Sequence, residues 1–351
     1  MEESLKDLKR ISWVCSEEEY RADPAYSYSI LAKYNREGFN KLDSLCDKVE
    51  SPSLTFGSAV DSLVTGGEEE FNERFFVADF PEIQDSQKKL TEALYKGFGN
   101  NYQSLLEIPD SIIISYTEQF KFQLNWKPET RVKVLKENCS YYYNLLLVSE
   151  GKTVLDNNTY TDVMDCVDAL KGSDATKWYF AKDNPIDGIN RYYQLKFKGE
   201  YKGIPLRVMA DLIVVDTLNK AIYPCDLKTS SHYEWDFPKS FIDWCYFIQA
   251  QLYWEIIHQN LMKDDYFKNY KLMNYRFIVV NRKTKTPLVW EFEDTRAITD
   301  LTYGDITLRN WRSIVEELDY YLKTTPIVPK GIDLHNANSI KQYFNNINNG
   351  N

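Results

Sequence analysis

The sequence predicts an α/β fold of the α+β type, in which a mixed central β-sheet is flanked by helices. Two β-branched, apolar runs, 206–216 and 221–228, are separated by only four residues, as in a β-hairpin. A helical stripe of apolar residues follows over 238–262, and two more strand-like runs come after it, at 275–281 and 288–292. Strands that resume after a helix predict a mixed sheet with helices packed on it.

Residues 1–185 are predicted to form an N-terminal helical region. The segment 1–25 is an acidic, partly helical lead, and 26–66 holds an opening helix, a Ser-Pro-Ser loop and a second helix that starts around Gly57 and Asp61. The segment 67–150 is mainly helical and is expected to form an added lobe. A capped turn at 151–162 then leads into a helix that ends near Leu170.

Residues 186–330 are predicted to form the sheet core, as one functional unit with the region before it. Its first strand is expected at 191–198, ahead of the hairpin. An amphipathic helix is expected over 305–322, with Asp305 as its N-cap. The Asn-rich tail 331–351 is expected to be poorly ordered.

The predicted hairpin brings three charged residues together. A four-residue loop between its strands pairs Asp216 with Ala221, and counting outward places Asp211 opposite Asp226. Side chains alternate between the faces of a strand, so Lys228 lies on the same face as Asp226. Two carboxylates and one ammonium therefore converge on one patch of the sheet.

This set of residues suits the hydrolysis of a phosphodiester with a divalent metal. Mg²⁺ and Mn²⁺ prefer hard oxygen ligands, here the two carboxylates and the carbonyl of Leu227. The ion lowers the pKa of a bound water, and Lys228 stabilises the negative charge that develops. The alternative is that these are ordinary polar residues at strand ends. Asp211 argues against it, because a carboxylate in an apolar strand is costly unless it is paired or bound to a metal.

The helix after the hairpin adds two polar side chains. Gln249 and Tyr253 lie one turn apart on one face, beside its apolar stripe. An amide and a phenol at these positions can contact a DNA backbone or support the metal site.

Taken together, these motifs resemble the PD-(D/E)XK nuclease superfamily, in the branch of RecB-like domains and of phage exonucleases such as lambda exonuclease and RecE. Four motifs carry the resemblance, and they occur in the expected order along the chain. They are the opening stretch Tyr26–Tyr34, the stretch 54–63, Asp211 with Asp226-Leu227-Lys228, and Gln249–Tyr253. The stretch 54–63 resembles the G-x-x-x-H motif of that branch, except that Asp61 stands four residues after Gly57 where many relatives have histidine.

The resemblance implies a restriction-endonuclease-like core and a deoxyribonuclease that uses one or two Mg²⁺ or Mn²⁺ ions. It implies metal binding by Asp61, Asp211, Asp226 and Leu227, catalysis by Asp211, Asp226 and Lys228, and DNA binding or support of the site by Gln249, Tyr253, Ser29, Lys33 and Arg36. Asp61 remains a good ligand for either ion, although the metal preference can differ from that of histidine.

The activity implied is that of an exonuclease on the ends of linear double-stranded DNA, in phage-type recombination or replication. The implied partners are DNA, a single-strand annealing protein and further copies of the chain in a ring. The implied location is the cytoplasm, of a bacterial host if the gene is phage-encoded. Two alternatives remain: an endonuclease or nickase specific for DNA structure, and a catalytically silent DNA-binding module of the same fold.

Composition is compatible with this function without demanding it. A net charge of −10 disfavours broad DNA binding, but basic residues cluster at 121–136 and 263–285. The tyrosines at 141–143 and 192–193 are candidates for stacking on bases. No apolar run approaches the length of a membrane span. The six scattered cysteines are expected to be reduced. Some relatives in the resembled family carry an iron–sulfur cluster that uses one early cysteine and several after the nuclease core. Because no cysteine follows Cys245, the resemblance implies no cluster of that type here.

Overall fold

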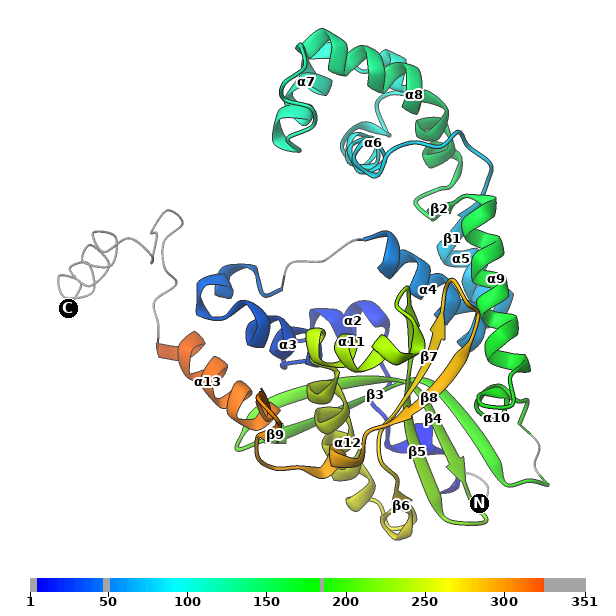
Figure 1. The fold of residues 1–351 in the computed structure, drawn as a ribbon, viewed down its shortest axis with the longest axis vertical. Coiled ribbons are helices and arrows are strands. Elements are labelled where there is room, and N and C mark those ends of the chain that lie inside the picture. The colour runs from blue at the N-terminus through cyan, green and yellow to red at the C-terminus, as the bar shows by residue number, and fades with distance from the viewer. Residues whose placement is uncertain (1–4, 47–50, 184–185, 325–351) are drawn as a thin grey trace, which may run out of the picture. The chain divides into compact units, whose positions relative to one another are not determined.

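A computed structural model describes residues 5–46, 51–183 and 186–324 (Figure 1). The predicted tail lies outside these residues. The chain divides into two compact units, one made of Met1–Leu54 with Asp168–Asn351 and the other of Thr55–Val167. This division differs from the predicted boundary after residue 185, because buried residues of the N-terminal segment, among them Leu8 and Leu31, belong to the core of the sheet.

The first unit, here called the sheet unit, is built on one mixed sheet. Its strand order is β3-β4-β5-β7-β8, with β6 also paired to β5. The strands β5 and β7 run parallel, as do β5 and β6, and the other neighbours are antiparallel. The bounds are β3 Ile189–Tyr201, β4 Ile204–Asp216, β5 Ala221–Ser230, β6 Lys271–Leu272, β7 Arg276–Asn281 and β8 Pro287–Glu291. The predicted fold class, a mixed sheet with flanking helices, is confirmed.

Helices cover the sheet because β5 and β7 are parallel, and a parallel pair needs a crossover connection. Here the crossover is α11 (Phe237–Asp243) followed by α12 (Tyr246–Met262). The apolar side of α12 packs on β3 and β4, and α3 (Tyr28–Glu37), the predicted opening helix, packs beside α12. The other helical elements of this unit are η1 Leu8–Ile11, α2 Glu17–Ala22, η2 Phe39–Ser44, α10 Lys177–Phe180, η4 Glu234–Asp236, η5 Phe267–Asn269, η6 Glu293–Arg296 and α13 Trp311–Thr324.

The single helix predicted over 238–262 is wrong, since the structure breaks it at Cys245. That residue has a left-handed backbone conformation, with φ of 58°, which an uninterrupted α-helix cannot contain. The break separates α11 from α12 and lets the two helices take different directions. The apolar periodicity continues through the break, so the sequence pattern did not reveal it.

The prediction that Asp305 caps the last helix is also wrong. Gly304 and Asp305 instead form the turn of a small hairpin between β9 (Leu301–Tyr303) and β10 (Ile306–Leu308). Gly304 has φ of 59°, and a Gly-Asp pair between two strands is a recognised hairpin signal. The helix begins six residues later, where the side chain of Asn310 accepts a 3.1 Å hydrogen bond from the backbone nitrogen of Arg312.

The second unit is mainly helical, as predicted for its lobe. Its elements are α4 Pro52–Thr65, α5 Gly67–Arg74, β1 Phe75–Val77, α6 Asp85–Phe98, η3 Leu105–Glu107, α7 Asp110–Gln119, α8 Pro128–Val148, β2 Thr153–Leu155 and α9 Asn157–Gly172. Leu90, Leu94 and Leu135 lie in its core, between α6 and α8. Arg131, a member of the first basic cluster, is buried and donates a 2.8 Å hydrogen bond to Thr117, so it is not a surface charge.

No helix in the described part of the chain is both long and apolar enough to cross a membrane. The six cysteines carry free thiols, and four of them, Cys139, Cys166, Cys225 and Cys245, are buried.

An acid-sensitive contact ties the N-terminal segment to the sheet unit. Arg10 donates a 2.9 Å hydrogen bond to Asp264, and the backbone nitrogens of Tyr266 and Phe267 donate to the same carboxylate. The bond from Arg10 is the largest cause that lowers the pKa of Asp264, to about 2. A carboxylate whose pKa is lowered by folding contributes stability above its unfolded pKa of about 3.9. That stability is lost as the pH falls through about 2.

We therefore expect Asp264→Asn to lower the urea midpoint at neutral pH and to flatten its fall between about pH 4 and pH 2. Urea unfolding of both proteins across this range measures the effect. Parallel curves for the two proteins would show that Asp264 titrates normally.

Candidate active site

The β4–β5 hairpin has the predicted register. Asp216 pairs with Ala221, and the ladder continues to Leu212 and Cys225. The carboxylate of Asp216 closes the turn, because it accepts hydrogen bonds from the backbone and side-chain nitrogens of Asn219 at 2.8 and 2.7 Å. Asp216 is therefore a turn residue. The ladder ends at the pair of Leu212 and Cys225, one position before Asp211 and Asp226.

At Asp211 the strand β4 leaves regular pairing. On the β3 side the ladder joins Tyr193 to Leu212 and Leu195 to Ala210, and skips the pair between them. The skipped residue of β3 is Gln194, whose φ of 53° is left-handed. A positive φ is uncommon for a residue other than glycine, and it interrupts the regular strand geometry at this point.

The carboxylate of Asp211 lies against the neighbouring strand. Its Oδ2 accepts a 3.1 Å hydrogen bond from the backbone nitrogen of Leu227, the residue between Asp226 and Lys228. The structure thus brings Asp211 to the Asp226–Lys228 segment, as the counting of residues predicted.

Asp226 is held between an ammonium and an amide. Its side chain is 2% exposed, and its Oδ2 lies 2.6 Å from Nζ of Lys228. Its Oδ1 accepts a hydrogen bond from the side-chain nitrogen of Gln249, on α12. We call Asp211, Asp226, Lys228 and Gln249 the carboxylate site.

The carboxylate of Asp226 keeps Lys228 charged. Burial disfavours the ammonium, but its attraction to Asp226 is the largest cause that raises the pKa of Lys228, and the net shift is upward. The ammonium also lies 4.8 Å from the ring centroid of Tyr246, in a cation–π contact. Lys228 therefore acts as a permanent positive charge at neutral pH.

A cluster of tyrosines surrounds the site. The rings of Tyr28 and Tyr253 meet edge to face at 6.5 Å, as do those of Tyr253 and Tyr275 at 6.0 Å. Burial raises the pKa of Tyr28, Tyr246, Tyr253 and Tyr275, so these phenols stay neutral and can donate hydrogen bonds.

Of this cluster, only Tyr253 was predicted from the sequence. A signal for Tyr246 was present, because Tyr246, Gln249 and Tyr253 are spaced three and four residues apart and so share one face of α12. Tyr28 and Tyr275 come from distant segments, and no local pattern marks them.

The opening helix reaches the site through Tyr28 rather than through the three residues predicted on it. The hydroxyl of Tyr28 donates a 2.7 Å hydrogen bond to the carbonyl of Trp244. Ser29 and Arg36 lie on the exposed side of α3, and the half-buried Lys33 donates to the carbonyl of Ser44. The guanidinium of Arg36 lies 5.3 Å from the ring centroid of Trp244. Contact of these three residues with DNA stays a prediction.

Asp61 lies on α4, in the other unit, and its role as a metal ligand stays a prediction. The same holds for the carbonyl of Leu227, whose backbone nitrogen is the group engaged by Asp211.

The residues present suit a divalent cation. The described residues contain no group of three or more His, Cys, Asp or Glu side chains that could hold a metal, and the carboxylate site itself offers two carboxylates. Mg²⁺ is commonly held by one or two carboxylates, with water and substrate phosphate completing its shell. The Lys228 ammonium lies beside Oδ2 of Asp226, so this carboxylate already has a cation as its neighbour. The carbonyl oxygen of Gln249 is buried with no hydrogen-bond partner among the described residues, and can accept one from a bound water.

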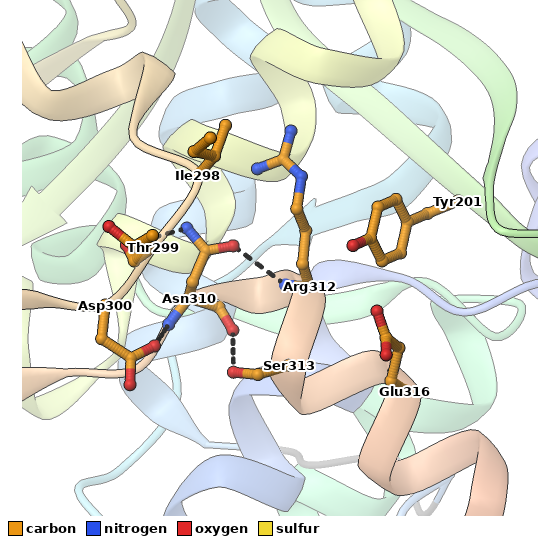
Figure 2. A pocket seen from close by; sticks show the side chains of 8 residues that line it. All are labelled: Tyr201, Ile298, Thr299, Asp300, Asn310, Arg312, Ser313 and Glu316. Atoms are coloured by element: carbon orange, nitrogen blue, oxygen red, sulfur yellow. Dashed lines mark hydrogen bonds between the residues drawn. The ribbon is translucent and has the colours of Figure 1, made fainter.

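A separate hollow of about 490 Å³ lies at the start of α13 (Figure 2). The polar groups of Asn310 in it are already paired: its backbone nitrogen donates to Asp300, and its side-chain nitrogen donates to the carbonyl of Thr299. These bonds hold the beginning of the helix, and we assign the hollow no function.

Comparison with known proteins adds little to this geometry. No protein-family model and no curated protein matches the sequence. Among solved structures, the chain is similar to a crystal structure from Eubacterium rectale that is named provisionally as an exonuclease. The two sequences are 14% identical, the TM-score is 0.43, and the match covers 89% of this chain and 85% of that chain. A likeness of this size does not establish a family, so function is argued from the carboxylate site.

Proposed function

We propose that this protein is a deoxyribonuclease that hydrolyses phosphodiester bonds at the carboxylate site with Mg²⁺ or Mn²⁺. One observation carries the proposal. The buried carboxylate of Asp226 lies between the ammonium of Lys228 and the side-chain amide of Gln249. The next residue, Leu227, donates its backbone N–H to the carboxylate of Asp211. Burying a charge is costly even when the charge is paired, and buried, strongly interacting charges cluster at functional sites.

In the reaction, a water attacks phosphorus and one P–O ester bond breaks, which leaves a phosphate on one product and a hydroxyl on the other. A divalent ion bound by Asp211 and Asp226 would lower the pKa of that water and neutralise charge on the phosphate. Lys228 orients the water and stabilises the charge on the phosphoryl oxygens. Gln249 holds Asp226 in position, and the neutral tyrosines supply donors but no base.

The finer assignments rest on the resemblance of the motifs. We propose an exonuclease that degrades linear double-stranded DNA from its ends, in phage-type recombination or replication. A single-strand annealing protein and a ring of identical subunits are the partners that this activity would use.

A cleavage assay tests the proposed function. Purified protein is incubated with linear and with closed-circular DNA in Mg²⁺, Mn²⁺ or EDTA, beside the Asp226→Asn variant. We expect loss of linear DNA only, with either metal, and none with EDTA or with the variant. Cutting of circles would make the protein an endonuclease. Binding of DNA without cleavage under any metal would make it a silent DNA-binding module.

Asp61 is a further proposed metal ligand, from the resemblance of its motif. If it binds the metal, Asp61→Ala should raise the Mn²⁺ or Mg²⁺ concentration needed for half-maximal cleavage, and Asp61→His should restore activity with a changed balance between the two metals. Rates and metal dependence that are identical in Asp61→Ala and the wild type would remove Asp61 from the site.

A further inference from the structure

Two aromatic rings stack on each other in the loop that follows β5. The rings of Tyr233 and Trp235 are 4.6 Å apart and nearly parallel, with 10° between their planes. Both side chains face solvent, with 48% and 72% of their surfaces exposed. Large aromatic side chains are costly to expose, and a stacked pair presents a flat apolar face. We call Tyr233 and Trp235 the stacking pair.

The loop of the stacking pair is fastened to the turn between β7 and β8 (Figure 1). The carboxylate of Glu234 accepts hydrogen bonds from the hydroxyls of Thr284 and Thr286. The carbonyl of His232 accepts a 2.6 Å hydrogen bond from the side chain of Asn281. The rings therefore stand on a loop that is anchored to the β7–β8 turn.

That turn is basic. Residues 281–286 include Arg282, Lys283 and Lys285, and the loop beside them contributes two acids, Glu234 and Asp236. The backbone nitrogen of Arg282 donates a 2.8 Å hydrogen bond to the carbonyl of Ser230, which places the turn at the end of β5. Cationic side chains beside exposed aromatic rings are the combination that binds single-stranded nucleic acid, the cations at phosphates and the rings at bases.

The stacking pair is also close to the carboxylate site along the chain. Tyr233 follows Lys228 by five residues, so their Cα atoms are at most about 18 Å apart. A stacked strand spans this distance in about five nucleotides, at about 3.4 Å each. By contrast, three of the tyrosines that the sequence suggested for stacking, Tyr142, Tyr143 and Tyr192, are buried.

From these observations we propose that the stacking pair and the basic turn bind one unpaired DNA strand and guide it at the carboxylate site. A base stacks on the outer face of Trp235, and the cations of the turn lie along the phosphates. The inference rests on the proposed function for its substrate, and it adds that the substrate has a single-stranded segment next to the bond that is cut.

Binding in the absence of metal tests this proposal without depending on cleavage. The affinity for a fluorescently labelled oligothymidylate is measured by anisotropy in EDTA. Base–aromatic stacking of the usual strength predicts that Trp235→Ala weakens binding about tenfold, and that Trp235→Phe retains most of it. Lys283→Gln should reduce the slope of log affinity against log salt by about 0.7. Tyr320→Ala is the matched control, because Tyr320 is 62% exposed on α13, outside this loop and turn.

The outcomes separate this proposal from the proposed function. Equal affinity of the wild type, Trp235→Ala and Tyr320→Ala overturns the binding role of the stacking pair, even if metal-dependent cleavage is found. An equal loss in Trp235→Ala and Tyr320→Ala also overturns it, since the effect would not be local. A loss confined to Trp235→Ala supports it, even if the cleavage assay shows a silent DNA-binding module.

Discussion

Replacing Asp211 with asparagine is expected to abolish metal-dependent cleavage while leaving the fold intact. Asparagine has the same shape and keeps an oxygen that accepts from the backbone nitrogen of Leu227. It lacks the charge that binds a hard cation, so we expect the cleavage rate to fall by about 100-fold or more. Calorimetric titration with Mn²⁺ should show a parallel loss of metal affinity.

The matched control lies on the same strand. Asp216→Asn makes the same chemical change five residues away, where the carboxylate closes the hairpin turn on Asn219. We expect this variant to cleave at the wild-type rate, with a loss of stability of about 1 kcal/mol or less. If both variants keep full activity, Asp211 has a structural role. If both variants lose activity and also lose their cooperative thermal unfolding transition, the hairpin has unfolded.

Replacing Lys228 with methionine is expected to remove cleavage and to destabilise the metal-free protein. Methionine retains the apolar stem, but leaves the carboxylate of Asp226, which is 2% exposed, without its cation. Breaking a buried pair from one side costs about 3 kcal/mol or more, because the remaining charge is uncompensated. The cleavage rate should fall by about 1000-fold, since the charge that faces the reacting phosphate is lost.

A double-mutant cycle separates the coupling free energy between Asp226 and Lys228 from the destabilisation that each single substitution causes by itself. Asp226→Asn combined with Lys228→Met should be more stable than the sum of the two single losses, since no charge is left unpaired. The pair of Lys268 and Asp265 is a control, because its separation is also 2.6 Å but its side chains are 46% and 100% exposed. The exposed pair should show a coupling of at most about 1 kcal/mol. Equal coupling in the two cycles would mean that burial does not strengthen the pair of Asp226 and Lys228.

Several features of the site follow from local periodicity and were predictable. The four-residue loop sets which residues of β4 and β5 face each other, and alternation along β5 places Asp226 and Lys228 on one face. The spacing of Gln249 and Tyr253 likewise follows from the helical repeat. A period of two or of 3.6 residues depends only on the backbone, so it can be counted along the chain.

The same periodicity gives a wrong prediction where the backbone turns. The apolar stripe of 238–262 continues across Cys245, although the helix breaks there at a left-handed residue. Asp305 is a residue type that commonly caps helices, but here it forms part of the turn between β9 and β10. The break at Cys245 depends on tertiary packing that overrides a local preference, whereas the hairpin at Gly304 and Asp305 follows a local turn signal.

The sequence alone determined that two carboxylates and a lysine would meet on one hairpin, because that meeting depends on a short loop and regular strands. Only the tertiary structure decided how they are used. It moves Asp211 out of the ladder at Gln194, brings the amide of Gln249 onto Asp226, and closes the tyrosine cluster with Tyr28 and Tyr275. These contacts join segments far apart in the chain, and packing between such segments leaves no periodic trace in the sequence.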